Sequence, residues 1–289
     1  MSADSERLDR ANTAIVVDST ADLSPQLLGD PNVTMVPLKI HFGDEALRDW
    51  VDIRPAEFYR RLREAPRLPT TSQPSVGAFI TEYRRLRADF PVVYSVHISG
   101  RLSGTVASAE LAASEVDGVR VFDTRSACVA VGLLLDRILA MLDRGTTAAE
   151  VEGLIERFHR DCGFLFIVDT LEYLQKGGRI GRASSLAGGL LSIKPLLTLT
   201  DGEVDVFAKV RGERKALAAV IDYFLTRTRP DVPVALVVGD ANAPEKTQTL
   251  VELLRATDRS IDLRFTGEVG AVIGTYTGPG TCAVVFIEE

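Results

Sequence analysis

The stretch that decides the fold is Thr-Ala-Ile-Val-Val-Asp-Ser-Thr-Ala-Asp-Leu, residues 13–23. Its first six residues are apolar and β-branched, which is typical of a buried strand, and a hydroxyl-rich segment follows directly. Similar apolar runs occur at residues 33–42, 92–98 and 119–122, and helical patterns lie between them at residues 54–65, 76–90, 104–116 and 126–144. Crossover helices favour parallel strand pairing, so the pattern predicts that residues 13–161 form a doubly wound, mainly parallel α/β domain.

The second half of the chain has a different pattern. It begins with an apolar run at residues 163–168. The pattern at residues 194–210 predicts two strands joined by a tight turn at Asp201-Gly202. Further strands are expected at residues 233–238, 261–265 and 281–287, with helices at residues 212–228 and 244–257. Residues 162–289 therefore predict a second α/β domain with a mixed sheet. Because clefts between domains commonly hold ligands, we examine segments of both halves together.

Composition narrows the class of protein. The chain has 289 residues, of which 46% are hydrophobic and 25% charged, as in an ordinary folded protein with about two domains. Its formal charge is −7, and this argues against nucleic acid as a partner, because polyanion binding needs a basic surface. Residues 1–12 mix both charges without an apolar core, so we expect a flexible N-terminal tail and not a secretory signal.

The apolar windows and the cysteines point to the same cellular setting. No window reaches the roughly 18 to 20 apolar residues that span a bilayer, since Asp136 and Arg137 interrupt the nearest one, so no integral membrane segment is expected. Cys128, Cys162 and Cys282 lie far apart and form no CxxC pair. This spacing fits neither a disulfide framework nor a zinc site, and a reducing cytoplasm is the simplest location.

Motifs for metal, nucleotide and hydrolase chemistry are missing. His41, His97 and His159 fall on separate predicted elements without HExxH spacing, so no metal site is expected. The sequence has no Walker A loop and no Rossmann GxGxxG, and residues 100–104 lack the GxSxG spacing of a nucleophile elbow. We therefore expect no cofactor.

Three hydroxyl-rich segments end predicted strands of the first half, where open α/β sheets usually bind ligands. The segment at residues 18–23 is better explained by helix capping. In residues 70–75, Thr71 and Ser72 are left over after capping and could donate to a ligand oxygen. In residues 99–105, Ser103 fits an N-cap, and Gly104 beside it would also let an anionic group approach the backbone.

Two glycine-rich segments complete the set. The loop from Lys176 to Arg182 carries three cations among glycines, which suits a phosphate or an acidic partner surface and equally a solvated turn. Residues 274–280 surround Tyr276 with glycine and proline and predict a turn-rich loop before the last strand.

These five segments, in this order and over nearly the whole chain, resemble the DegV family. The matching stretches are residues 18–23, 71–75, 102–105, 176–181 and 275–280. The resemblance implies two α/β domains that hold one long-chain fatty acid in a tunnel between them, with its carboxylate bound by hydroxyl groups. It also implies a lipid-binding protein that catalyses no reaction alone, and similar proteins present the acyl chain to a fatty acid kinase subunit.

The resemblance assigns roles to individual residues. The two head-group hydroxyls fall on Thr71 and Ser103. The family's usual histidine is replaced by Tyr276, which can donate a hydrogen bond but cannot become cationic near neutral pH. A family arginine aligns with Arg211, and Arg179 matches the position suited to docking the kinase subunit.

Two alternatives stay open at this point. The first is an enzyme that acts on a phosphorylated or ester substrate through Ser103 or the Lys176 to Arg182 loop, although Ser103 has no evident base beyond the unplaced His97. The second is a regulatory protein with a vestigial pocket, which predicts that no lipid copurifies.

Overall fold

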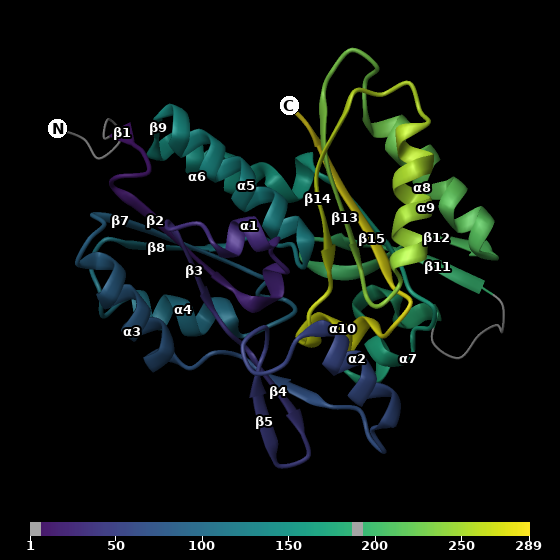
Figure 1. Cartoon of the computed structure of the whole chain (residues 1–289), viewed down its shortest axis with the longest axis horizontal. Coiled ribbons are helices and arrows are strands. Elements are labelled where there is room, and N and C mark those ends of the chain that lie inside the picture. The colour runs from purple at the N-terminus through teal and green to yellow at the C-terminus, as the bar shows by residue number, and fades with distance from the viewer. Residues whose placement is uncertain (1–6, 187–192) are drawn as a thin grey trace.

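The computed structural model describes residues 7–186 and 193–289. Figure 1 shows two α/β lobes side by side, the N-terminal lobe in purple to teal and the C-terminal lobe in green to yellow. The predicted fold class, two α/β domains with a parallel and a mixed sheet, is confirmed. The expected boundary near Asp161 falls between the last helix of the first lobe and the first strand of the second.

The N-terminal sheet is parallel and has the strand order β3-β2-β7-β8. Its strands are β2 (Thr13–Asp18), β3 (Val33–Val36), β7 (Val92–His97) and β8 (Val119–Asp123). One face packs on α3 (Val76–Arg87) and α4 (Thr105–Ala113) through Ala14 and Val16. The opposite face, with Ile15 and Val17, belongs to a larger core that includes α5 (Val129–Arg144) and α6 (Ala148–Asp161). Helices on both faces make this a doubly wound sheet.

The single strand expected at residues 33–42 is in fact two strands in different sheets. β3 ends at Val36, and β4 (Lys39–Phe42) begins a separate antiparallel sheet with β5 (Glu45–Arg48) and β6 (Thr70–Ser72). Pro37 lies at the break, and proline has no N–H to continue the ladder. The short helix α2 (Pro55–Glu64) connects β5 to β6. This small sheet carries Thr71 to the lobe interface.

The prediction of a flexible tail at residues 1–12 is wrong for residues 7–12. Residues 1–6 lie outside the described part of the chain. β1 (Arg7–Leu8) pairs antiparallel with β9 (Thr146–Thr147). Leu8 is 1% exposed and belongs to the main core, so burial of one apolar side chain holds the segment in place.

The C-terminal sheet is mixed and has the strand order β12-β11-β10-β15-β13-β14. Its strands are β10 (Gly163–Ile167), β11 (Ile193–Thr200), β12 (Glu203–Arg211), β13 (Val234–Asp240), β14 (Ile261–Glu268) and β15 (Cys282–Glu288). β11 and β12 form the predicted hairpin, and Asp201 and Gly202 both have positive φ, as a tight primed turn requires. Only β13 and β14 run parallel within this sheet.

The two faces of this sheet have different partners. α8 (Glu213–Arg227) and α9 (Pro244–Arg255) cover the outer face. Residues of the inner face, such as Phe166, Val237 and Val285, belong to the same core as Ile15 and the apolar residues of α5. The two lobes therefore share a hydrophobic core, with α5 packed between them (Figure 1).

The turn-rich loop expected at residues 274–280 is mostly helical. α10 (Ala271–Thr277) occupies its first half, and the glycines with positive φ, Gly278 and Gly280, come only after it. Gly274 permits the helix, because a Cβ there would meet Tyr59 Oη at 2.6 Å and Phe58 at 2.8 Å. The other helical segments are α1 (Pro25–Leu28), α7 (Glu172–Lys176) and the 3₁₀ turns Ser19–Ala21 and Gly181–Leu186.

Cys128, Cys162 and Cys282 are all buried with free thiols. Across the described ranges, no helix combines the length and apolarity that would be needed to cross a membrane.

Candidate ligand-binding cavity

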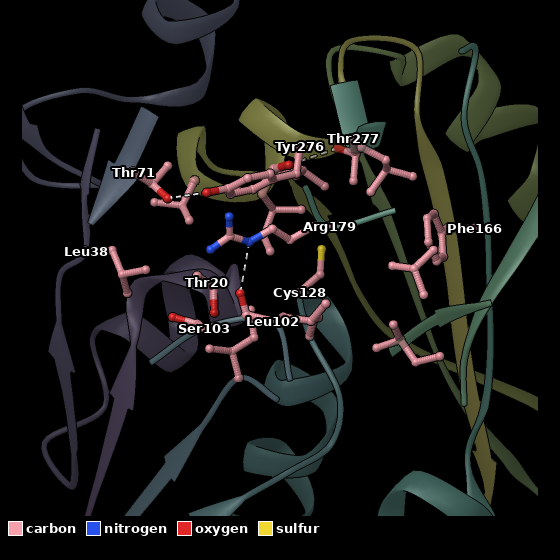
Figure 2. A pocket seen from close by; sticks show the side chains of 18 of the residues that line it. Thr20, Leu38, Thr71, Leu102, Ser103, Cys128, Phe166, Arg179, Tyr276 and Thr277 are labelled. Carbon is pink, nitrogen blue, oxygen red and sulfur yellow. Dashed lines mark hydrogen bonds between the residues drawn. The ribbon is translucent and has the colours of Figure 1, made fainter. Parts of the chain in front are cut away.

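A cavity of about 320 Å³ lies between the lobes and is lined by residues of both. This volume is at the lower end of the roughly 300–1,000 Å³ typical of small-molecule sites. Apolar walls come from β10, the β11–β12 hairpin, α10 and β15, and include Phe164, Phe166, Leu199, Val204, Val272 and Ala283. Figure 2 shows Phe166 at one end, with Thr71, Ser103 and Arg179 toward the other. The cavity thus has an apolar part and a polar end.

Thr71 and Tyr276 meet across the lobe interface at this polar end. β6 carries Thr71, and its Oγ1 lies 2.6 Å from the hydroxyl of Tyr276 on α10 (Figure 2). The neighbouring Ser72 also lines the cavity, and its Oγ lies 2.9 Å from His41 Nε2. The structure therefore brings together hydroxyl groups that the sequence placed 205 residues apart.

Ser103 and Gly104 reach the cavity from the loop before α4. Ser103 Oγ lies 2.8 Å from Thr105 Oγ1 and accepts a hydrogen bond from the Thr105 N–H at 3.3 Å. Gly104 lines the cavity too, but the group that approaches its backbone is the side chain of Gln73, with which a Cβ at this position would collide. The space beside the Gly104 backbone, where we expected an anionic group, is thus occupied by the Gln73 side chain.

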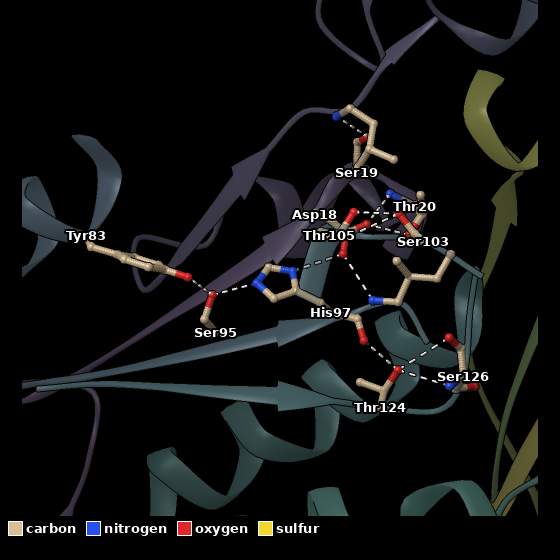
Figure 3. A network of polar contacts seen from close by, with 12 residues as sticks. Asp18, Ser19, Thr20, Tyr83, Ser95, His97, Ser103, Thr105, Thr124 and Ser126 are labelled. Atoms are coloured by element: carbon tan, nitrogen blue, oxygen red, sulfur yellow. Dashed lines mark hydrogen bonds and ion pairs between the residues drawn. The ribbon is translucent and has the colours of Figure 1, made fainter. Parts of the chain in front are cut away.

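A buried polar network lies behind this loop (Figure 3). Asp18 accepts hydrogen bonds from His97 Nδ1 at 3.0 Å, from the Ile98 N–H at 3.1 Å and from the N–H and hydroxyl of Thr20. Burial opposes ionisation of Asp18, but the bonds from His97, Thr20 and Ile98 outweigh it and lower the pKa of the carboxyl. This carboxylate fixes the end of β7 and the hydroxyl of Thr20.

Thr20 is a cavity residue that the sequence reasoning missed. Capping explains the Asp18 side chain, which accepts the Thr20 N–H, yet Thr20 also lines the cavity. Cys128 also lines the cavity and was missed as well. It precedes α5 with a positive φ of 59°, a feature that only the structure shows. Burial raises the pKa of the Cys128 thiol well above its ordinary value, so the thiol is protonated.

Arg179, which we predicted to dock a kinase subunit, lines the wall of the cavity. Its Nε donates to Leu102 O at 3.2 Å, its Nη1 donates to Gly177 O at 2.9 Å, and the guanidinium lies 4.9 Å from the centre of the Tyr276 ring. The side chain is exposed, and none of the described carboxylates pairs with it. Arg179 therefore places a positive charge at the polar end of the cavity.

The other cations of the Lys176 to Arg182 loop face elsewhere. Lys176 pairs with Glu172, and Arg182 lies 3.3 to 3.7 Å from Asp201, Glu203 and Asp205. The three cations do not converge on one point, which removes the main argument for a phosphate clamp.

Arg211, expected among the ligand contacts, is exposed at the end of β12 and does not line the cavity. It pairs in the ladder with Ile193, at the end of the hairpin opposite the turn. The length of β12 carries Arg211 away from the hairpin turn at Asp201 and Gly202.

The described residues also offer no activating base for Ser103. The partner of its hydroxyl is Thr105, while the two nitrogens of His97 contact Asp18 and Ser95. A nucleophilic serine needs such a base within hydrogen-bond reach. Within residues 7–186 and 193–289, no cluster of three or more potential metal ligands occurs either.

The sequence profile of the DegV family, described as an uncharacterised protein family, matches residues 12–289. The chain belongs to the DegV family. A DegV domain-containing protein of Halalkalibacterium halodurans is 35% identical over 279 residues, covering 96% of this chain and 98% of the relative.

Solved DegV structures share the fold. A fatty acid-binding DegV family protein of Thermus thermophilus superposes with a TM-score of 0.92 at 37% identity, covering 96% of this chain and 100% of the other. DegV of Bacillus subtilis, described as a fatty acid binding protein, superposes with a TM-score of 0.87 at 30% identity and covers 96% and 100% of the two chains. The resemblance drawn from five short segments is confirmed at the level of the whole DegV chain.

Proposed function

We propose that this protein binds one long-chain fatty acid in the cavity between its lobes, with the carboxylate at the hydroxyl-rich end and the acyl chain along the apolar wall. The observation that carries the proposal is the division of the cavity into a Thr71, Ser103 and Tyr276 end and a wall of aliphatic and aromatic side chains. The fatty acid binding described for the Thermus thermophilus and Bacillus subtilis relatives supports it.

The affinity of such a complex depends on the acyl tail and the head group together. Burial of about 15 methylenes at roughly 0.8 kcal/mol each contributes on the order of 12 kcal/mol. Association costs about 4 to 15 kcal/mol, a range that includes the contribution of the tail, so the head group decides the affinity. A carboxylate removed from water needs hydrogen-bond donors. Thr71, Ser103 and Tyr276 provide hydroxyl donors, and Arg179 adds a cation beside them.

The role that follows is that of an acyl carrier which catalyses no reaction by itself. The exposed guanidinium of Arg179 at the polar end supports a bound state in which the carboxylate stays accessible from outside. A fatty acid kinase subunit in the cytoplasm is the partner that we propose for it, with Arg179 next to the surface where the two proteins meet.

Native mass spectrometry of the purified protein, followed by lipid extraction, tests the proposal. We expect one fatty acid per chain, or stoichiometric uptake when palmitate is added to delipidated protein. A protein that carries no lipid and takes up no palmitate would overturn the proposal. A pull-down with the purified protein as bait tests the kinase partner separately, and recovery of no kinase subunit would count against it.

A further inference from the structure

Two buried aspartate side chains of the N-terminal lobe hold the beginning of α10 in the C-terminal lobe. Asp22 Oδ1 accepts the Gly270 N–H at 2.8 Å, and Asp49 Oδ1 accepts the Ala271 N–H at 3.0 Å. Asp22 follows the first 3₁₀ turn and Asp49 follows β5, so two separate segments of one lobe converge on consecutive amides of the other. Both side chains are 1% exposed.

The contact between the two lobes leaves no room for a side chain at Gly270. A Cβ at this position would collide with Trp50 Nε1 and would lie 2.8 Å from Asp22 Oδ1 and 3.2 Å from Asp49 Oδ1. Trp50 Nε1 itself donates to Asp22 Oδ1 at 3.2 Å. One residue earlier, the hydroxyl of Tyr59 donates to the Val269 carbonyl at 2.9 Å. Four side chains of the N-terminal lobe therefore fix the entry to α10.

The arrangement costs free energy that a purely structural contact would not require. The Oδ2 atoms of Asp22 and Asp49 are both buried without a hydrogen-bond partner among the described residues. Burying an unpaired polar atom is unfavourable, and an apolar contact would hold two lobes together without that cost. The aspartate side chains do what an apolar contact cannot, since their Oδ1 atoms fix the direction of two backbone N–H groups.

The direction of α10 matters because this helix carries cavity residues. Val272, Ile273, Tyr276 and Thr277 all line the cavity, and the Tyr276 hydroxyl must lie within reach of Thr71. A helix of seven residues is nearly rigid, so its first amides set the place of Tyr276 one and a half turns later. We propose that Asp22 and Asp49 are positioning residues that hold Tyr276 at the head-group end of the cavity. This inference rests on the proposed function.

A double-mutant cycle with palmitate as the probe tests the inference. Asp49→Ala removes the acceptor of the Ala271 N–H, whereas Asp49→Asn keeps a carbonyl oxygen at that place. Asp49 suits the test better than Asp22, whose φ of 44° would add backbone strain to an alanine variant. The matched control is Asp52→Ala, because Asp52 lies three residues further on, is bound to Arg48 and forms no hydrogen bond with α10 among the described residues.

We expect Asp49→Ala to weaken palmitate binding roughly tenfold, the factor for loss of one buried hydrogen bond, and Asp49→Asn and Asp52→Ala to stay within about threefold. In a Tyr276→Phe background the loss caused by Asp49→Ala should shrink to less than about threefold, because the group being positioned is gone. An equal loss in both backgrounds would mean a role in stability alone and would overturn the inference.

A ligand-free measurement separates this inference from the proposed function. Ring signals of ¹³C-labelled tyrosine are recorded for the delipidated wild type and Asp49→Ala, and the Tyr276 signal among the six tyrosines is identified with Tyr276→Phe. We expect Asp49→Ala to shift the Tyr276 signal and Asp52→Ala to leave it in place. An unmoved Tyr276 signal would overturn the positioning role, whether or not the wild type binds palmitate. Wild-type protein that refuses palmitate while the signal moves would overturn only the proposed function.

Discussion

Thr71 Oγ1 and the Tyr276 hydroxyl lie 2.6 Å apart, and this contact joins the two lobes at the polar end of the cavity. β6 brings the threonine and α10 brings the tyrosine. Neither lobe alone contains the pair, so the head-group end is assembled only when the lobes are docked. The family's usual histidine at position 276 would offer an imidazole here, whereas this chain offers a phenol that stays neutral near pH 7.

Tyr276→Phe should lower the free energy of unfolding by about 0.5–1.5 kcal/mol and weaken palmitate binding, because it removes the interlobe hydrogen bond and one donor to the head group. Thermal unfolding and calorimetric titration measure the two effects. Tyr173→Phe is a suitable control, since this nearby part-buried tyrosine packs on Gly278 and its hydroxyl makes no hydrogen bond with the described residues. Equal affinity in Tyr276→Phe and wild type would remove Tyr276 from the head-group site.

Ser103→Ala should weaken fatty acid binding by about tenfold or more, because a hydrogen bond to a charged group contributes roughly 1.5 to 3 kcal/mol. Ser114→Ala is the matched control, since Ser114 follows α4, the helix after Ser103, and within the described residues its exposed hydroxyl bonds only to Leu111 O. Fluorescence competition with a labelled fatty acid gives both affinities. If the two variants behave alike, Ser103 does not contact the ligand.

Ala283→Phe should shift the preference toward shorter acyl chains. Ala283 lines the cavity and pairs across the sheet with Phe166, at the end away from Thr71. A phenyl ring there would occupy space that the end of a long chain needs, and overpacking of this kind costs about 1–3 kcal/mol. Competition between dodecanoate and palmitate, read by native mass spectrometry, measures the shift. An unchanged ratio would mean that the acyl chain does not reach β15.

Asp22→Asn should make stability less dependent on pH. Burial raises the pKa of Asp22 to about 7, although the hydrogen bonds from Gly270 and Trp50 oppose the shift and the nearby charge of Asp18 adds to it. Burial, together with the charge of Asp22, also raises the pKa of Asp49. In the unfolded chain both groups lose their protons near pH 4. Between about pH 4 and 7 the folded state thus holds more protons, and its stability falls as the pH rises.

Melting temperatures at pH 5 and pH 8, at constant ionic strength, test this prediction. The wild type should lose more stability between the two values than Asp22→Asn, which has no proton to release at this position. Groups remote from this site contribute to both proteins alike, and Asp49 titrates together with Asp22, so the difference between the slopes reports on this pair. Parallel slopes would show that Asp22 is ionised at both pH values.

The sequence predicted the strands of both sheets well because their periodicity and β-branched composition are local properties. It also selected Thr71, Ser103 and Tyr276, since these stand in short motifs whose order along the chain is characteristic. Arg179 was selected for another role, and its place on the cavity wall follows from its contacts with Leu102 and Gly177. Such contacts depend on the docking of the lobes, which no local pattern encodes.

The sequence reasoning failed where one residue overrides a longer pattern. Pro37 interrupts an apolar run that otherwise predicts one strand. Gly274 looks like a turn residue, yet the packing of Tyr59 and Phe58 against its backbone makes it part of a helix. Leu8 holds a segment whose charges suggested a free tail. The contacts of Asp22 and Asp49 with α10 could not be predicted, because their partners are backbone amides some 220 to 250 residues away.

The shared core has a consequence for how this chain folds. Apolar residues of β10, β13 and β15 pack in one continuous cluster with those of β2 and α5, and the lobes have no core boundary between them. Residues 13–161 made alone would expose the inner face of α5 to water, and an exposed apolar surface of that size promotes aggregation. We therefore expect one cooperative unfolding transition for the whole chain, and separately expressed halves that fold only when mixed.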